Sequence, residues 1–428
     1  PQVSEGVNYA PFERQFGRIL SPFEQFIHHQ TTSGILLMLT AIVALVLANS
    51  VWAEAYEHLS HLTIGITAGN WSLTYSLQHW INDGLMALFF FVVGLELKRE
   101  ILVGELANLR RAALPVIAAL GGMIMPALIY LAFNTDGPQV HGWAIPMATD
   151  IAFAVGVLAL LASRVPKALV TFLVALAIAD DLGAVVVIAL FYTSKISLVH
   201  LGAAAFTTFL LLLLNAGGVR RILPYFVLSI PLWYFLLLSG VHPTLAGVIG
   251  AFTIPARPLY NPAFFTERSR QLLQEFEESL QDNPSVVTNE RLRDVVHSLE
   301  KTSQKAMAPL QRLEDIWHVP VAFLVIPVFA LFNAGIPLDL ANMQAAFGSS
   351  ITQGVALGLL AGKFIGIFGF SYIAVKTGWA LLPKDTSMGQ IAGVALLGGI
   401  GFTMSIFISQ LAFPLEPHHV IEAKAGIF

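Results

Sequence analysis

Long apolar runs separated by short polar stretches dominate the chain. Most of these runs reach the roughly 20 residues that an α-helix needs to cross ~30 Å of hydrocarbon. Because the runs are solid rather than alternating, they predict a bundle of helices and not membrane strands. A further run starts near Val420, and we expect it to be the truncated start of a twelfth helix. The eleven complete runs cover residues 32–50, 78–97, 112–133, 143–163, 168–192, 199–217, 222–240, 244–256, 319–338, 352–375 and 389–413.

Two stretches depart from this pattern. Aromatic and aliphatic residues recur every three or four positions between residues 9 and 30, which predicts a helix lying on the membrane surface. Residues 257–318 are charged but keep a helical pattern broken at Asn283 and Pro284, which predicts a cytoplasmic helical hairpin or a solvated loop without a specific role. The predicted parts are 1–30 (interfacial helix), 31–256 (transmembrane helices 1–8), 257–318 (charged loop) and 319–428 (helices 9–11 and the start of 12).

The distribution of basic residues predicts the orientation. With the N-terminus inside, the external loops receive only Lys195, and this asymmetry supports both the helix count and the direction. The cytoplasmic segments receive Arg14, Arg18, Lys98, Arg99, Arg110, Arg111, Arg164, Lys167, Arg220, Arg221, the eight basic residues from Arg257 to Arg312, Lys376 and Lys384.

Composition agrees with a multi-pass membrane protein and excludes other classes. Hydrophobic residues make up 56% of the 428 residues and charged residues only 12%, whereas soluble domains are about one quarter charged. The net charge of −4 and the lack of a long basic tract argue against a nucleic-acid partner. With no cysteine, the chain has no disulfides, thiolate metal sites or cysteine nucleophiles. We expect no cofactor and no enzymatic activity.

A few ionisable residues fall inside the apolar runs, where each costs at least ~2.5 kcal/mol on insertion scales. Asp180 and Asp181 lie about a dozen residues from either end of their run, and Lys363 lies at a similar depth in another. Asp150 follows Thr149 in the fourth run. These residues are therefore the first candidates for a functional site, and Asp83 and Glu96 flank the second run.

Two adjacent carboxylates at mid-depth favour ion exchange over a purely structural ion pair. In a water-poor site the two groups cannot both be ionised easily, so proton binding competes with cation binding. Oxygen ligands suit a small hard cation. Lys363 has two interpretations that can coexist: a fixed counter-charge, or a participant in the proton cycle.

Helix breakers occur at matching places in two parts of the chain. Pro146 precedes Asp150 in the fourth run, and the eleventh contains Gly398, Gly399 and Gly401. The fourth run is the second of three runs in residues 112–192, and the eleventh is the second of three from residue 352 onward. Interrupted helices at matching places are typical of an inverted-repeat transporter, in which they are broken at the midplane of the membrane. Asp150 and Lys363 would neutralise the facing half-helix ends. Glycine and proline are also common in membrane helices for packing reasons.

Six stretches together resemble the NhaA-type sodium/proton antiporter family, and the resemblance spans nearly the whole chain. The stretches are Trp80–Ala87, Val93–Glu100, Ala148–Phe153, Ala177–Gly183, Ser239–Gly247 and Gly399–Ser405.

The resemblance implies a role for individual residues. Asp180 and Asp181 would bind sodium and protons, Lys363 would be the essential lysine of the tenth helix, and Thr149 and Asp150 would form the unwound crossing of the fourth. Residues implied in the unwound part of the eleventh helix are Gly401, Phe402 and Thr403. Residues implied in the response to pH are Glu96, Arg99, Glu100, His242 and Glu314.

As a whole, the resemblance implies an all-α inverted-repeat protein of about twelve helices in the bacterial inner membrane, with a cytoplasmic N-terminus. It would export Na⁺ or Li⁺ in exchange for H⁺ by alternating access, electrogenically and under pH control, with the lipid bilayer as its surroundings and a homodimer left open. The alternative is a sodium-coupled symporter of a small organic solute. Few other polar groups are buried, which favours ions over an organic solute. A passive cation channel is a weaker alternative. An intramembrane aspartyl protease is weaker as well, because Asp180 follows Ala179 rather than the glycine of a protease motif.

Overall fold

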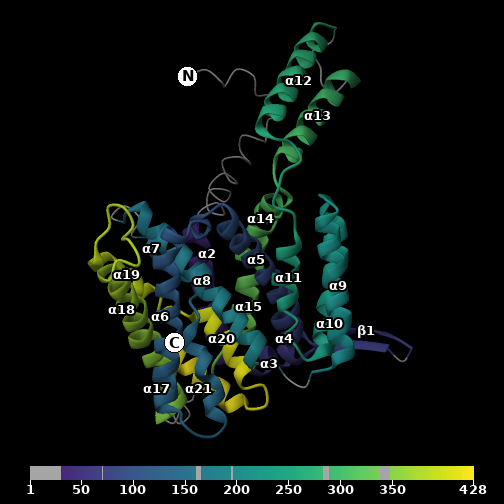
Figure 1. The fold of residues 1–428 in the computed structure, drawn as a ribbon. Helices are drawn as coiled ribbons and strands as arrows, with labels where there is room; N and C mark the ends of the chain where they lie inside the picture. Colours follow the sequence, from purple (N-terminus) through teal and green to yellow (C-terminus); the bar gives the residue numbers. More distant parts are fainter. Residues whose placement is uncertain (1–29, 70, 161–164, 194–195, 283–288, 338–347) are drawn as a thin grey trace. The chain divides into compact units, whose positions relative to one another are not determined.

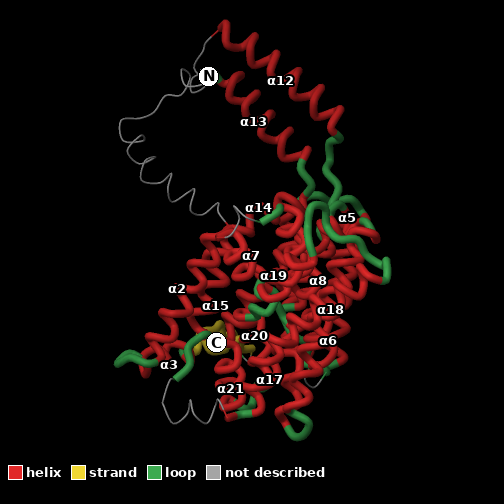
Figure 2. The backbone as a smooth tube through the Cα atoms, turned by 90° about the vertical axis from the view of Figure 1, so that its left-hand side faces the viewer, coloured by secondary structure: helices red, strands yellow, loops and turns green. Residues whose placement is uncertain are grey.

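The computed structural model describes residues 30–69, 71–160, 165–193, 196–282, 289–337 and 348–428. Figure 2 shows that these residues are mostly helical, with strands limited to one hairpin. Within the described residues, seven helices are long and apolar enough to cross a membrane, or nine if each of two bent helix pairs is one span. The helical membrane protein expected from the sequence is thus present, while the count of twelve helices stays a prediction.

The chain forms two compact units. The first comprises the described residues within 30–85, 108–192 and 319–428, and the second comprises those within 86–107 and 193–318. The described elements of the first unit are α2 (Gln30–Ala48), α3 (Ala53–His61), β1 (Thr63–Ala68), β2 (Trp71–Ser76), α4 (Leu77–His79), η2 (Trp80–Leu85), α6 (Leu109–Phe133), η4 (Pro138–Met147), α7 (Ile151–Leu160), α8 (Lys167–Phe191), η6 (Val321–Val325), α15 (Ile326–Asn333), α17 (Ser350–Leu357), η7 (Gly358–Gly362), α18 (Lys363–Lys376), α19 (Met388–Leu397), α20 (Phe402–Ala412) and α21 (Pro417–Ile427).

Glycines allow α6 and α18 to pack closely in the first unit, and the two helices lie side by side in Figure 1. A Cβ atom on Gly366 would lie only 2.1 Å from the carbonyl oxygen of Gly121, and one on Gly121 would lie 2.3 Å from that of Gly366. Small residues at such a crossing let two backbones approach inside a membrane protein. Because Lys363 begins α18 one turn earlier, this contact also fixes the lysine backbone against α6.

The second unit has its own apolar core, which includes Leu95, Leu211, Tyr225 and Leu232. Its α5 and α11 run in the same direction, since Gly247 contacts Ala87 at their start. At their end, Lys98 Nζ donates hydrogen bonds to the carbonyl oxygens of Phe252 (2.6 Å) and Ile254 (2.5 Å). The described elements of this unit are α5 (Met86–Leu102), η3 (Glu105–Ala107), α9 (Leu198–Ala216), α10 (Ile222–Ser239), α11 (Leu245–Thr253), α12 (Pro262–Asp282), α13 (Glu290–Ala306) and α14 (Pro309–Pro320), which continues into the first unit.

Helices α12 and α13 pack side by side within the charged segment (Figure 1). Leu272 of α12 and Leu292 and Val295 of α13 are buried. The Asn289 amide, which caps α13, also donates to the Ser279 carbonyl of α12 at 3.2 Å. The helical periodicity of this segment therefore reflects two helices that bury their apolar faces.

Two features of the fold differ from the sequence prediction, and one predicted helix falls on residues that the structure does not describe. The antiparallel pair β1 and β2 was not predicted, because a search for long apolar runs passes over a segment of alternating Thr, Ile, Leu and Tyr. The ninth span begins at Pro309 rather than 319, since α14 continues without a break into η6. The interfacial helix expected before residue 30 lies outside the described residues.

Candidate functional site

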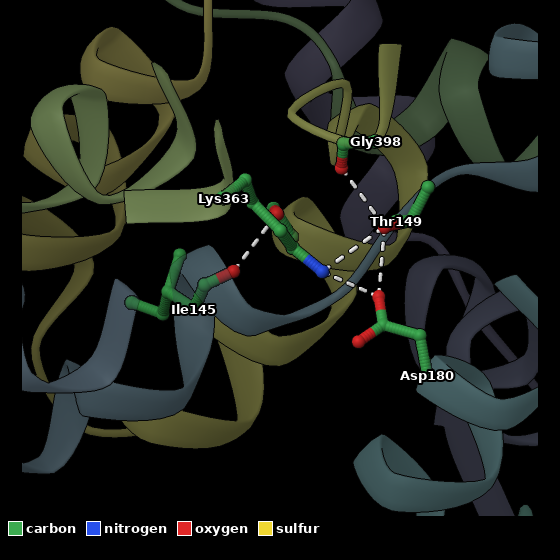
Figure 3. Close-up of polar contacts among 6 residues, drawn as sticks. Ile145, Thr149, Asp180, Lys363 and Gly398 are labelled. Atoms are coloured by element: carbon green, nitrogen blue, oxygen red, sulfur yellow. Dashed lines mark hydrogen bonds and ion pairs between the residues drawn. The ribbon is translucent and has the colours of Figure 1, made fainter. Parts of the chain in front are cut away.

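The candidate ion site gathers side chains from three segments of the first unit (Figure 3). Asp180 and Asp181 are successive residues in α8, and each is only 1% exposed. Lys363, the first residue of α18, is fully buried and follows the π-helical turn η7. Thr149 lies in the non-helical link between η4 and α7.

The ammonium group of Lys363 points at Asp180. Its Nζ lies 2.5 Å from Asp180 Oδ2 and 3.0 Å from Thr149 Oγ1. The Thr149 hydroxyl is 2.7 Å from the same carboxylate oxygen and 2.9 Å from the Gly398 carbonyl, and its single hydrogen serves one acceptor at a time. A lysine, a hydroxyl and a carboxylate thus share one buried contact point.

The second carboxylate oxygen of Asp180 and the adjacent Asp181 complete the set of acidic groups at the site. Asp180 Oδ1 is buried and accepts no hydrogen bond from the residues that the structure describes. Asp181 lies close enough for its charge to act on Lys363. Buried carboxylate oxygens need a cation, a proton or hydrogen bonds to offset the loss of water. Chemically, this arrangement can hold a small cation or a proton and can exchange one for the other.

Two chain segments lose their helical structure beside this site. Residues 148–150 separate η4 from α7, and residues 398–401 separate α19 from α20, whose axes differ by 50°. The two links run against each other, because the Asp150 N–H donates to the Ile400 carbonyl at 2.7 Å and Thr149 reaches Gly398. Irregular backbone at this position exposes carbonyl and N–H groups that a continuous helix would hide.

Asp150 joins the starts of two helices. Its Oδ1 accepts the Phe153 N–H of α7 at 3.0 Å, and its Oδ2 accepts the Thr403 N–H of α20 at 3.0 Å. The Thr403 hydroxyl donates to the same Oδ2 at 2.5 Å. A helix N-terminus carries partial positive charge, so one carboxylate compensates both. Gly401, the N-cap of α20, and Phe402, its first residue, also lie at this end.

A second group of charged residues lies in the second unit. Arg99 contacts Glu314 Oε1 at 2.9 Å and Glu100 Oε1 at 3.2 Å. Glu96 Oε1 lies 3.6 Å from His318 Nδ1. Four of the five residues assigned to pH response by resemblance are therefore part of this one group.

His242 does not join that group. It lies in the turn before α11, where its carbonyl accepts the Leu245 N–H at 3.2 Å. Because α5 and α11 are parallel, this turn is at the start of α5, whereas Arg99 is at its end.

The sequence interpretation missed two kinds of contact. Backbone carbonyls of Gly398 and Ile400 meet Thr149 and Asp150, although the glycine run already marked that segment as irregular. The second is His318, which the sequence interpretation did not single out. Its spacing of four residues from Glu314 on α14 already indicated that the two side chains are neighbours on one helix face.

Comparisons with known proteins give a consistent result. The family model described as "Na+/H+ antiporter 1" matches residues 24–428. The Na(+)/H(+) antiporter NhaA 1 of Saccharophagus degradans is 54% identical over 416 residues, which cover 97% of this chain and 90% of that protein. The Na(+)/H(+) antiporter NhaA of Sulfurimonas denitrificans is 51% identical over 421 residues, covering 98% and 94%. The chain belongs to the Na⁺/H⁺ antiporter 1 family.

Proposed function

We propose that this protein exchanges sodium ions for protons across a membrane and that both ions use the site around Asp180 and Asp181. The observation that carries the proposal is the buried contact of Lys363 with Asp180 and Thr149, next to a second carboxylate and two non-helical links. The family relatives are named as antiporters of these same ions, which supports the assignment.

The site suggests how the ions alternate. Carboxylate oxygens, the Thr149 hydroxyl and the backbone carbonyls beside it are hard ligands suited to Na⁺ or Li⁺. When sodium enters, its charge competes with the Lys363 ammonium for Asp180, so the pair separates. When protons are bound instead, the lysine returns to the carboxylate. A lysine that loses its proton on sodium binding would make the exchange electrogenic.

Alternating access fits the inverted-repeat arrangement. Residues 112–192 and the segment from 352 onward each contain one of the interrupted helices and contribute to the ion site, so the two repeats can rock around it as the rest of the protein stays fixed. Twelve helices in the bacterial inner membrane with the N-terminus in the cytoplasm complete this proposal. In that orientation the Arg99 group faces the cytoplasm, where it would adjust transport to pH.

A symporter of an organic solute is not favoured. Close to Asp180, the described polar side chains are already engaged with one another, which leaves oxygen ligands for an ion but no set of donors and acceptors for a larger polar molecule.

The test is proton flux in proteoliposomes that contain the purified protein and a pH-sensitive dye. Adding NaCl outside, with no organic solute present, should move protons in the opposite direction to sodium, and choline chloride should have no effect. Sodium uptake without any proton movement would contradict the proposal.

A further inference from the structure

Three side-chain amides form a closed ring in the first unit, apart from the ion site. Asn333 Nδ2 donates to Asn82 Oδ1 at 2.8 Å, Asn82 Nδ2 donates to Gln410 Oε1 at 2.7 Å, and Gln410 Nε2 donates to Asn333 Oδ1 at 2.5 Å. The three residues come from η2, α15 and α20. Each amide therefore donates to one neighbour and accepts from the other.

Asn333 is the centre of this amide ring. It is fully buried, and besides the ring bonds it donates to the Phe329 carbonyl at 2.9 Å and accepts from Gln78 Nε2 at 3.0 Å. An amide has two donor hydrogens and two acceptor positions, so all four are used. If the Asn333 amide rotated by about 180°, its NH₂ group would face the NH₂ groups of Gln78 and Gln410, and these hydrogen bonds would be lost. The ring therefore favours a single arrangement of the three segments that it joins.

The ring joins a helix of the ion site to segments outside the proposed repeats. Helix α20 begins at Phe402, and its Thr403 holds Asp150. Gln410 lies seven residues later on the same helix, which is about 10 Å at 1.5 Å per residue. Neither η2 nor α15 belongs to residues 112–192 or to the segment from 352 onward. Each ring residue lies near one end of its apolar run. In the predicted orientation, that end is on the external side of the membrane.

We propose that Asn82, Asn333 and Gln410 form an external latch, which holds α20 against η2 and α15 while the ion site is closed to the outside, and which opens once in each transport cycle. This inference rests on the proposed function and on alternating access. Rocking of the repeats against the rest of the protein must separate α20 from η2 and α15 at their outer ends. Neutral amides suit a contact that opens, because wetting them exposes no unpaired charge, unlike a buried ion pair.

Another buried asparagine offers a matched control. Asn134 Nδ2 donates to the Ser350 carbonyl at 3.0 Å, and Ser350 Oγ donates to Asn134 Oδ1 at 2.8 Å. Asn134 is 2% exposed and also lies near the outer end of its run. It connects α6 with α17, and both helices belong to the repeats. This contact should therefore stay closed throughout the cycle.

The absence of cysteine from the sequence makes cross-linking the direct test. We would prepare one variant with Asn333→Cys and Gln410→Cys and a control with Asn134→Cys and Ser350→Cys. A short, reducible thiol-reactive linker would join each pair in proteoliposomes. Sodium-driven proton flux would be measured before linking, after linking and after reduction, and sodium binding would be followed by the shift in melting temperature.

Linking the ring pair should stop exchange, reduction should restore it, and sodium should still raise the melting temperature. The linked control should keep exchanging. Exchange in the linked ring pair at its unlinked rate would overturn the latch, and so would an equal loss of exchange in both linked pairs.

The variant Gln410→Met gives a second readout, because a weaker latch should favour the state that is open to the outside. The apparent KM for external sodium should then fall severalfold relative to that for cytoplasmic sodium, and an unchanged ratio would also overturn the latch. Unmodified protein without any sodium-driven proton flux would instead contradict the proposed function.

Discussion

Two ion pairs of similar composition lie in very different surroundings. In the first unit, the side chains of Lys363 and Asp180 are 0% and 2% exposed. In the second unit, the side chains of Arg99 and Glu314 are 42% and 11% exposed. Because the Arg99 side chain is partly exposed, water and salt screen the second pair more than the first, and fully exposed pairs contribute only about 0–1 kcal/mol to stability. Removing one partner of a buried pair costs about 3–5 kcal/mol, because it leaves an uncompensated charge.

We propose that this difference in exposure gives the two pairs different functions. Under the proposed function, a buried pair with so large a cost of separation would separate only when another cation takes the place of the lysine, which would couple the pair to sodium. A pair with a partly exposed arginine should change partners at a lower cost than a fully buried one, which would suit adjustment by pH better than ion coupling. We therefore expect substitutions in the first group to abolish or recouple transport, and substitutions in the second to shift its pH range.

The largest effect should follow the loss of either buried carboxylate. Asp180→Asn and Asp181→Asn each remove a charge that we propose binds sodium or a proton, so each should abolish or severely reduce exchange while the protein still inserts and folds. Proteoliposome flux and size-exclusion profiles would measure both properties. Asp136→Asn, which changes an exposed carboxylate, is the control and should exchange normally. Wild-type flux in either site variant would remove that residue from the ion site.

Lys363→Gln should come next and should distinguish the two roles of the lysine. If Lys363 carries a proton, exchange should continue without responding to an imposed membrane potential, and the melting temperature should fall because Asp180 loses its counter-charge. Lys376→Gln alters an exposed lysine on the same helix and should change neither property. Exchange that responds to potential at the wild-type level would rule out the carrier role and leave Lys363 as a structural counter-charge.

Asp150→Asn should have an intermediate effect on stability. The amide keeps one acceptor but loses the charge that compensates the starts of α7 and α20, so we expect a loss of about 1–2 kcal/mol. Thermal unfolding would measure it. Ser387→Ala removes a cap from α19 away from the site and should cost about 1 kcal/mol without altering the KM for sodium. If Asp150→Asn unfolds at the wild-type temperature, Asp150 does not stabilise the two helix starts.

The smallest effect on rate is expected for Glu96→Gln. This change removes the acidic partner of His318, so the pH profile of transport should shift more than the maximal rate falls. Glu290→Gln changes an exposed glutamate paired with Arg293 and should leave the profile in place. A lower rate with an unchanged profile would make Glu96 a packing or permeation residue.

The sequence was sufficient for the helical membrane character of the chain and for singling out the charged residues within its apolar runs. Buried charge is so costly in a membrane that Asp180, Asp181 and Lys363 stood out without any structure, and the structure brings Lys363 against Asp180. Proline and glycine likewise marked the two segments that lose helical structure. In both cases the physical signal is local, since it depends on one residue and its immediate neighbours.

The contacts that depend on distant segments could not be predicted in this way. Nothing near Asn333 in the sequence indicates that its amide meets residues 82 and 410, because hydrogen bonds between helices depend on how the helices pack. The hairpin of β1 and β2 escaped a search for apolar runs for a different reason: each strand has only six residues, and polar residues interrupt its apolar ones. His242 was grouped with Arg99 by resemblance, whereas the direction of α11 places them at opposite ends of α5.

The most direct test of the central claim is the current that follows sodium jumps on a solid-supported membrane, recorded at several pH values. If sodium and protons compete for the same carboxylates, the apparent KM for sodium should rise steadily as the pH falls, while the current at saturating sodium stays nearly constant in the acidic range. An apparent KM for sodium that does not change with pH would contradict a shared site for the two ions.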